Sequence, residues 1–151
     1  MLHGATFFRS GAVEGKGIPA VETSDGPMGV RNEFPGDSWF PVGLSDDFVS
    51  YLPSNSALAA TWNTERAYEA GQVLGEETRG RGKDVILAPG INVKRDPLCG
   101  RNFEYMSEDP FLIQELTVPL IKGIQEADVA ACVKHFAANS QETDRLWVDT
   151  V

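Results

Sequence analysis

Residues 84–89 read DVILAP, and residues 129–133 read VAACV. Both are short, continuous apolar runs, which are typical of strands buried on both faces of a parallel sheet. A third extended run, IPAVET at residues 18–23, is closed by an Asp-Gly-Pro turn at residues 25–27. The sequence therefore predicts strands at all three places, which is the outline of an α/β fold.

A helix is expected between the strands predicted at residues 18–23 and 84–89. Asn63 predicts its N-cap, and glycines at positions 80 and 82 predict its end. One face of this helix carries mostly small residues at spacings of three and four: Ala67, Ala70, Gly71, Leu74 and Thr78. Small side chains on that face favour close packing against the sheet.

A second helix is expected to begin at Asp109-Pro110, because an N-cap residue followed by proline is a common helix start. Its apolar stripe consists of Ile113, Leu116, Leu120 and Ile124. Pro119 lies inside this segment and predicts a bend or a break there, because proline removes a helical hydrogen bond.

Strands that alternate with helices predict parallel βα units, whose helices cover the sheet. Two architectures fit this order, an open doubly wound sheet and part of a (β/α)8 barrel. In both, ligands bind at the carboxyl ends of the strands. Residues 32–56 predict a long loop with several aromatics, among which Trp39 and Phe40 are candidates to line a site, whereas Trp62 is expected in the core.

Composition excludes several classes of function. The chain has 151 residues with 13 Lys and Arg against 22 Asp and Glu, a net charge of 13 − 22 = −9. This charge argues against a nucleic-acid partner, which needs a basic face. No apolar run reaches the length of a membrane span, so no membrane partner is expected. The first ten residues carry no secretory signal, which predicts a cytoplasmic location.

The sequence predicts neither a metal site nor a cofactor. The two histidines, His3 and His135, are far apart in the sequence, and no nucleotide-binding glycine pattern stands before a helix. The two cysteines, Cys99 and Cys132, form no CxxC motif, and we expect reduced thiols.

Charged side chains follow all three predicted strands. Asp25 and Arg31 follow the first strand, and Lys134-His135 directly follow the third. The segment after the second strand contains Lys94, Arg95, Arg101 and Glu104. We expect them to converge, and such a set of donors and acceptors suits the hydroxyl groups of a sugar. Two plainer interpretations stay open: Asp25 as a turn residue and Arg101 as the partner of a structural ion pair.

Five stretches carry a closer resemblance. They are the Asp-Gly-Pro turn with Arg31, ALAATWN at 57–63, LAPGINVKRDPLCGRNFEYMSEDP at 87–110, KGIQ at 122–125 and KHFAANSQET at 134–143. In this order they resemble the N-terminal barrel of family 3 glycoside hydrolases. Ala137-Ala138-Asn139-Ser140 stands where the hexosaminidase branch carries Pro-Gly-His-Gly, so the resemblance is to the β-glucosidase branch.

The resemblance implies an incomplete (β/α)8 barrel domain over residues 1–151 and a β-glucoside or short gluco-oligosaccharide as ligand. Family members remove terminal nonreducing β-D-glucosyl residues with retention, using two carboxyl groups about 5–5.5 Å apart. The residues that would bind the sugar are Asp25, Arg101, Lys134 and His135, together with Arg31 and Arg145.

The resemblance also implies that the family's two catalytic residues are absent from this sequence. The family's nucleophile is an Asp in a Ser-Asp-Trp or similar motif, which this sequence lacks, and its acid/base Glu belongs to a later part of the family's chain. We therefore expect no catalytic carboxylate within residues 1–151, an inactive isolated chain, and the C-terminal part of the same enzyme as a partner. The alternative is a non-catalytic sugar-binding or structural fragment that associates with another polypeptide.

Overall fold

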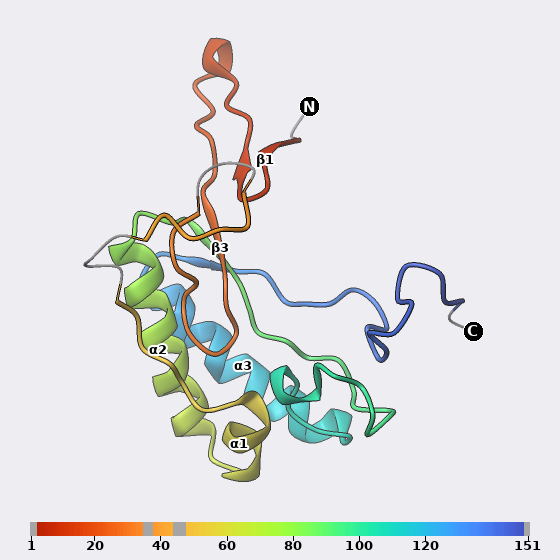
Figure 1. Ribbon diagram of the computed structural model, residues 1–151. Coiled ribbons are helices and arrows are strands. Elements are labelled where there is room, and N and C mark those ends of the chain that lie inside the picture. Colours follow the sequence, from red (N-terminus) through yellow and green to blue (C-terminus); the bar gives the residue numbers. More distant parts are fainter. Residues whose placement is uncertain (1–2, 35–37, 44–47, 150–151) are drawn as a thin grey trace.

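A three-stranded parallel sheet organises the structure (Figure 1), a computed structural model that describes residues 3–34, 38–43 and 48–149. The strands are β3 (Thr23–Asp25), β4 (Val85–Leu87) and β5 (Ala130–Ala131), in the order β3-β4-β5. The predicted mixed α/β fold with parallel strands is confirmed. Within the described ranges the sheet is open, and no closed barrel is present.

The first strand lies later than the sequence predicted. Residues 18–23 were expected to be extended, but the strand covers Thr23–Asp25 and pairs in register with Val85–Leu87. The preceding residues form antiparallel bridges instead, between Val13 and Ile18 and between Arg9 and Glu22. Asp25 is therefore the last residue of β3 and lies at the carboxyl edge of the sheet.

Two long helices connect the strands, and both predicted N-caps are confirmed. The Asn63 side chain accepts hydrogen bonds from two backbone N–H groups at the start of α2 (Thr64–Gly80). Asp109 does the same for one N–H group at the start of α3 (Pro110–Glu126). Of the bend or break expected at Pro119, the break is wrong, because α3 continues through this residue, and the bend stays a prediction. Burial of the apolar stripe holds this helix together despite the lost hydrogen bond.

Glycines let α2 and α3 approach each other closely. A Cβ atom on Gly71 would lie 2.1 Å from the carbonyl oxygen of Leu120, and one on Gly123 would lie 2.3 Å from that of Tyr68. Gly71 therefore packs against α3, and α2 also contacts β4 of the sheet, against which the sequence predicted its small residues to pack. The two helices lie side by side, with α2 against β4 and α3 against β5 (Figure 1).

The core lies between this helix pair and one face of the sheet. Ile86 and Ala88 are fully buried there, whereas Val85 and Leu87 on the other face are only half-buried. Residues 84–89 were expected to be buried on both faces. The difference follows from the single helical layer, which covers one face only.

The remaining elements lie outside the parallel sheet and the helix pair. A short antiparallel pair, β1 (Gly4–Thr6) and β2 (Arg9–Ser10), is followed by the 3-10 turn η1 (Glu14–Lys16), and this part projects from the body in Figure 1. A second 3-10 turn, η2 (Asn102–Glu104), precedes α3. In the part of the chain that the structure describes, no helix is long and apolar enough to cross a bilayer.

Helix α1 (Asn55–Ala60) was not predicted, although the side chain of Ser54 caps it by accepting a hydrogen bond from the Ala57 N–H group. Trp62 follows this helix and is 74% exposed, so its expected place in the core is wrong. It lies between two helices in the left-handed backbone conformation, with φ of 54°. The loop before α1 contains no helix or strand in residues 32–34, 38–43 and 48–53.

We predict that Gly71→Ala lowers the free energy of unfolding by about 1–3 kcal/mol, because the new methyl group meets the backbone of α3. Gly80→Ala in the same helix is the matched control, since a Cβ atom there meets nothing within 4 Å. The control should keep or slightly raise stability. Urea unfolding of both variants tests the helix contact, and equal stability of the two would contradict it.

Candidate functional site

The candidate site begins at the carboxyl end of β3. One Asp25 carboxylate oxygen accepts a hydrogen bond of 2.9 Å from the Gly26 N–H group and one of 2.6 Å from the Lys134 ammonium group. Lys134 is placed by its own backbone, which bonds to Pro89 and Ile91 and so continues the sheet beyond β5. The sheet register thus brings the two charges together.

Lys134 and its neighbours keep Asp25 ionised. Burial by itself raises the pKa of this carboxyl group. The hydrogen bond and charge of Lys134, the Gly26 N–H group and the charge of Arg31 together outweigh burial and hold the pKa of Asp25 below its ordinary value of 3.8. The site therefore presents a carboxylate whose oxygens can accept hydrogen bonds.

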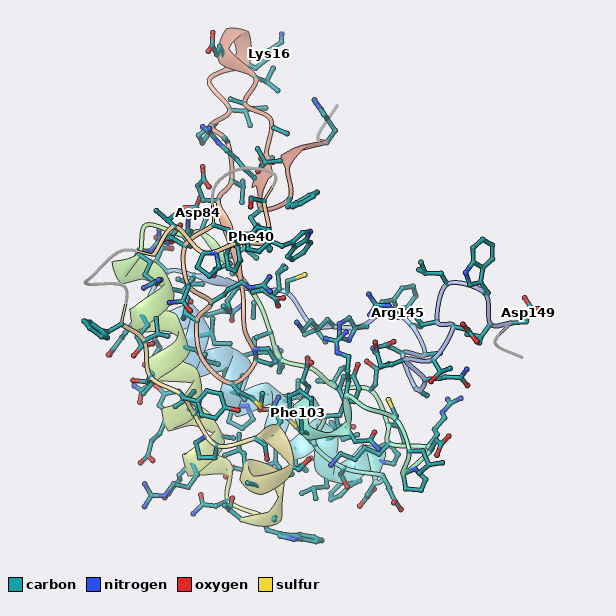
Figure 2. All side chains as sticks on the ribbon, viewed as in Figure 1. Lys16, Phe40, Asp84, Phe103, Arg145 and Asp149 are labelled. Atoms are coloured by element: carbon teal, nitrogen blue, oxygen red, sulfur yellow. The ribbon has the colours of Figure 1, made fainter. Side chains whose placement is uncertain are left out.

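Arg31 is held beside this carboxylate by aromatic rings. Its guanidinium carbon lies 4.6 Å from the ring centre of Phe34, 5.1 Å from that of Trp39 and 5.6 Å from that of Phe8. These are cation–π distances. One guanidinium nitrogen is 3.7 Å from the Asp25 carboxylate. Trp39 thus contributes to the site through Arg31, while Phe40 is 81% exposed (Figure 2).

Arg101 forms a bidentate salt bridge with Glu104 on η2. The two hydrogen bonds measure 2.7 and 2.8 Å, and the carboxylate of Glu104 is buried. The hydrogen bonds that Arg101 donates to Glu104 raise the pKa of Arg101 above its ordinary value. Glu104 is also 4.0 Å from the Lys134 ammonium group, so it connects the two cations.

His135 is held from both its backbone and its ring. Asn92 accepts a 2.7 Å hydrogen bond from the His135 N–H group, and the Tyr105 hydroxyl lies 2.8 Å from Nδ1 of the ring. Burial lowers the pKa of His135 below 6.5, and the charges of Arg101 and Lys134 lower it further. The opposing charges of Glu104 and Asp25 are weaker.

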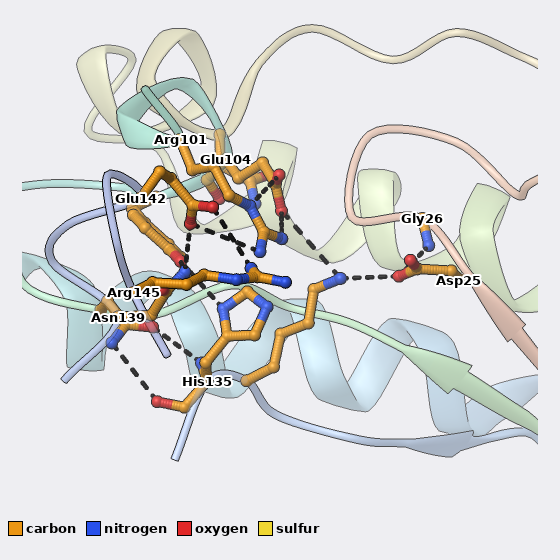
Figure 3. Close-up of polar contacts among 12 residues, drawn as sticks. Asp25, Gly26, Arg101, Glu104, His135, Asn139, Glu142 and Arg145 are labelled. Carbon is orange, nitrogen blue, oxygen red and sulfur yellow. Dashed lines mark hydrogen bonds and ion pairs between the residues drawn. The ribbon is translucent and has the colours of Figure 1, made fainter. Parts of the chain in front are cut away.

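Arg145 reaches the site through Glu142. Its guanidinium group is 3.2 Å from one Glu142 oxygen, and Arg101 is 3.7 Å from the other. Figure 3 shows the resulting network, which runs from Asp25 to Arg145. Two pockets flank this network. One of about 230 Å³ lies beside Asp25 and Arg31, and one of about 710 Å³ lies beside His135 and Arg145.

The structure therefore brings all six predicted site residues into one network. Both plainer interpretations also describe part of the geometry, because Asp25 bonds the next backbone N–H group and Arg101 forms an ion pair. Lys94, in the same segment as Arg101, instead donates to Ser56 on α1. A role in binding sugar stays a prediction for each of the six.

Sequence reasoning missed the residues that hold this set in place: Asn92, Tyr105, Asn139 and Glu142. The only signal was the position of Tyr105, directly after Glu104 in the segment that contains Arg101. In the described ranges, no group of three or more His, Cys, Asp and Glu side chains could hold a metal ion. The arrangement supplies fixed cationic donors and, at Asp25, a carboxylate acceptor, which suits an uncharged ligand rich in hydroxyl groups.

Comparison with known proteins agrees with this description. The family model described as the N terminal domain of glycosyl hydrolase family 3 matches residues 14–146. The chain belongs to glycosyl hydrolase family 3. Beta-glucosidase BoGH3A of Bacteroides ovatus is 51% identical to the family 3 chain over 133 residues, which is 88% of this chain and 18% of the relative.

A second family 3 relative carries a different name. The exo-alpha-(1->6)-L-arabinopyranosidase of Bifidobacterium longum is 43% identical over 138 residues, covering 91% of this chain and 18% of the relative. Among solved structures, beta-glucosidase 3B from Thermotoga neapolitana in complex with glucose superposes with a TM-score of 0.78 at 43% identity. That match covers 89% of this chain and 18% of the other. The family 3 chain thus spans 18% of the length of these relatives.

We predict that Lys134→Met raises the pKa of Asp25, because the variant loses a hydrogen bond and a positive charge while burial persists. The carboxyl ¹³C resonance of Asp25, followed through an acid titration of the family 3 chain, measures this. Since the folded pKa lies below 3.8, Asp25 stabilises the fold above that pH, and this contribution is lost as the pH falls through the folded pKa.

Lys83→Met is the matched control, because Lys83 is similarly buried but pairs with Glu33 at 3.0 Å. The pKa of Asp25 should stay low in that variant. An Asp25 pKa that is the same in both variants would contradict the assigned ion pair.

Proposed function

We propose that this chain carries the sugar-binding part of a β-glucosidase that removes terminal nonreducing β-D-glucosyl residues with retention. The observation that carries the proposal is the network at the carboxyl ends of the strands, in which a carboxylate and three basic side chains are already oriented. Membership of glycosyl hydrolase family 3 and the likeness to beta-glucosidases support it.

Each residue has a defined part in this proposal. Asp25 accepts hydrogen bonds from hydroxyl groups remote from the anomeric carbon. Arg101, Lys134 and His135 donate to hydroxyl groups around the ring, and Arg31 and Arg145 line the site. Charge-assisted hydrogen bonds of this kind are stronger than neutral ones, and those to the 2-hydroxyl group strengthen in an oxocarbenium-like transition state.

The three parallel strands are, in this proposal, the first part of a (β/α)8 barrel. Such a barrel takes about 250 residues, against 151 here. Half-buried Val85 and Leu87 on the face without helices support the proposal, because that face would line the barrel interior. Among the described residues β5 is an edge strand, and in this proposal its outer edge would pair with a further strand of the same enzyme.

We predict that the folded chain binds D-glucose with about millimolar affinity and that Asp25→Ala abolishes binding. The measurement is a titration followed by ¹H–¹⁵N NMR, with L-arabinose as a second sugar because one relative is named an arabinopyranosidase. Asp84→Ala is the control, since the Asp84 carboxylate accepts from the Glu22 N–H group at the opposite end of the strands. A folded wild-type chain without sugar binding, or equal binding in both variants, would contradict the proposal.

We also predict that the purified chain releases no 4-nitrophenol from 4-nitrophenyl β-D-glucopyranoside. The reason is that neither of the two carboxyl groups that retaining hydrolysis needs is assigned to residues 1–151. A rate that increases with the amount of chain and disappears in Asp25→Ala would place a nucleophile within this sequence. That result would favour a complete site over a binding fragment.

A further inference from the structure

A chain of hydrogen bonds leads from Glu142 to the ring of His135, and its direction can be worked out one atom at a time. The Glu142 carboxylate lies between two arginines, 3.2 Å from Arg145 and 3.7 Å from Arg101. A carboxylate has no hydrogen to donate, so Glu142 can only accept hydrogen bonds. The direction of each hydrogen bond that follows can be derived from this acceptor.

Asn139 is the next group. Its side-chain nitrogen lies 2.9 Å from a Glu142 oxygen and 2.7 Å from the hydroxyl oxygen of Tyr105. The opposite amide orientation would point the Asn139 carbonyl oxygen at the carboxylate, which puts two acceptors face to face. The amide orientation is therefore determined by Glu142, and Asn139 donates both of its N–H groups.

The Tyr105 hydroxyl group connects Asn139 to the ring of His135. Its hydroxyl oxygen accepts from Asn139, so its single hydrogen is available for Nδ1 of His135, 2.8 Å away. Burial raises the pKa of Tyr105 above its ordinary value, which keeps this hydrogen in place. Nδ1 must then present its lone pair, and a neutral imidazole with Nδ1 as acceptor carries its hydrogen on Nε2.

We propose that Glu142, Asn139 and Tyr105 act as positioning residues that hold His135 as the neutral Nε2–H tautomer, so that the ring offers a donor to a sugar hydroxyl oxygen. This inference rests on the proposed function for the ligand but not for the tautomer. The groups that face His135 favour a neutral ring: Arg101 and Lys134 disfavour its protonation more strongly than Glu104 and Asp25 favour it. Asn92 holds the backbone of His135 through two hydrogen bonds, which limits rotation of the residue.

The test is ¹H–¹⁵N correlation of the histidine ring nitrogens in the chain without sugar, at a pH where the rings are neutral. His3→Gln assigns the signals, because the chain has two histidines. Nδ1 of His135 should resonate in the range of an unprotonated ring nitrogen and Nε2 in that of a protonated one. A dominant Nδ1–H tautomer, or equal populations of both, would overturn the proposal.

Two variants test the direction of the chain. Tyr105→Phe removes the donor and should abolish the tautomer preference and raise the pKa of His135. Glu142→Gln leaves Tyr105 in place but frees the Asn139 amide to turn over, and it should also weaken the preference. Tyr68→Phe on α2 is the matched control and should change neither signal.

A tautomer that persists unchanged in folded Glu142→Gln and Tyr105→Phe would show that these residues do not set it. If Tyr105→Phe fails to fold, the spectra of Glu142→Gln and of the wild-type chain still show which tautomer His135 adopts and whether Glu142 sets it. Because no sugar is present, a failure to bind glucose would count against the proposed function and leave the tautomer result intact.

Discussion

The hydrogen bond between Lys134 and Asp25 joins residues that are 109 positions apart, and the remainder of the site is arranged around it. It forms because parallel pairing aligns the carboxyl ends of β3, β4 and β5 at one edge. Lys134 then meets Glu104, which orients Arg101, and Arg101 meets Glu142 and through it Arg145. Each group in this series contacts the one before it.

Alternation of charge explains how so many ionised groups share a partly buried region. A buried charge without a partner is costly, whereas one that is paired and hydrogen-bonded is tolerated. Here each cation has an acidic partner, as with Glu104 between Arg101 and Lys134. A sugar would thus meet donors and acceptors that are already ordered, which reduces the entropy lost on binding.

Much of the fold follows from local patterns in the sequence. The apolar runs at 84–89 and 129–133 and the caps Asn63 and Asp109 predict elements that the structure contains. The exposure of Trp62 and the continuity of α3 through Pro119 depend on tertiary packing, which no local pattern reports.

The site was predictable where residues directly follow strands, as for Lys134 and His135. The supporting residues were not, because Tyr105, Asn139 and Glu142 come from segments whose contacts depend on how the loops fold back. Their residue types are common in loops and carry no spacing signal. The same holds for the rings of Phe8 and Phe34 beside Arg31, which come from both sides of β3.

The central claim is that the network around Asp25 and Lys134 is a preformed sugar site. A crystal structure of the chain grown or soaked with glucose tests it most directly. The account predicts a sugar whose hydroxyl groups contact the Asp25 carboxylate and the side chains of Lys134, Arg101 and His135, with the protein groups unmoved. Glucose bound elsewhere, with the Asp25–Lys134 pair intact and no sugar against it, would contradict the account.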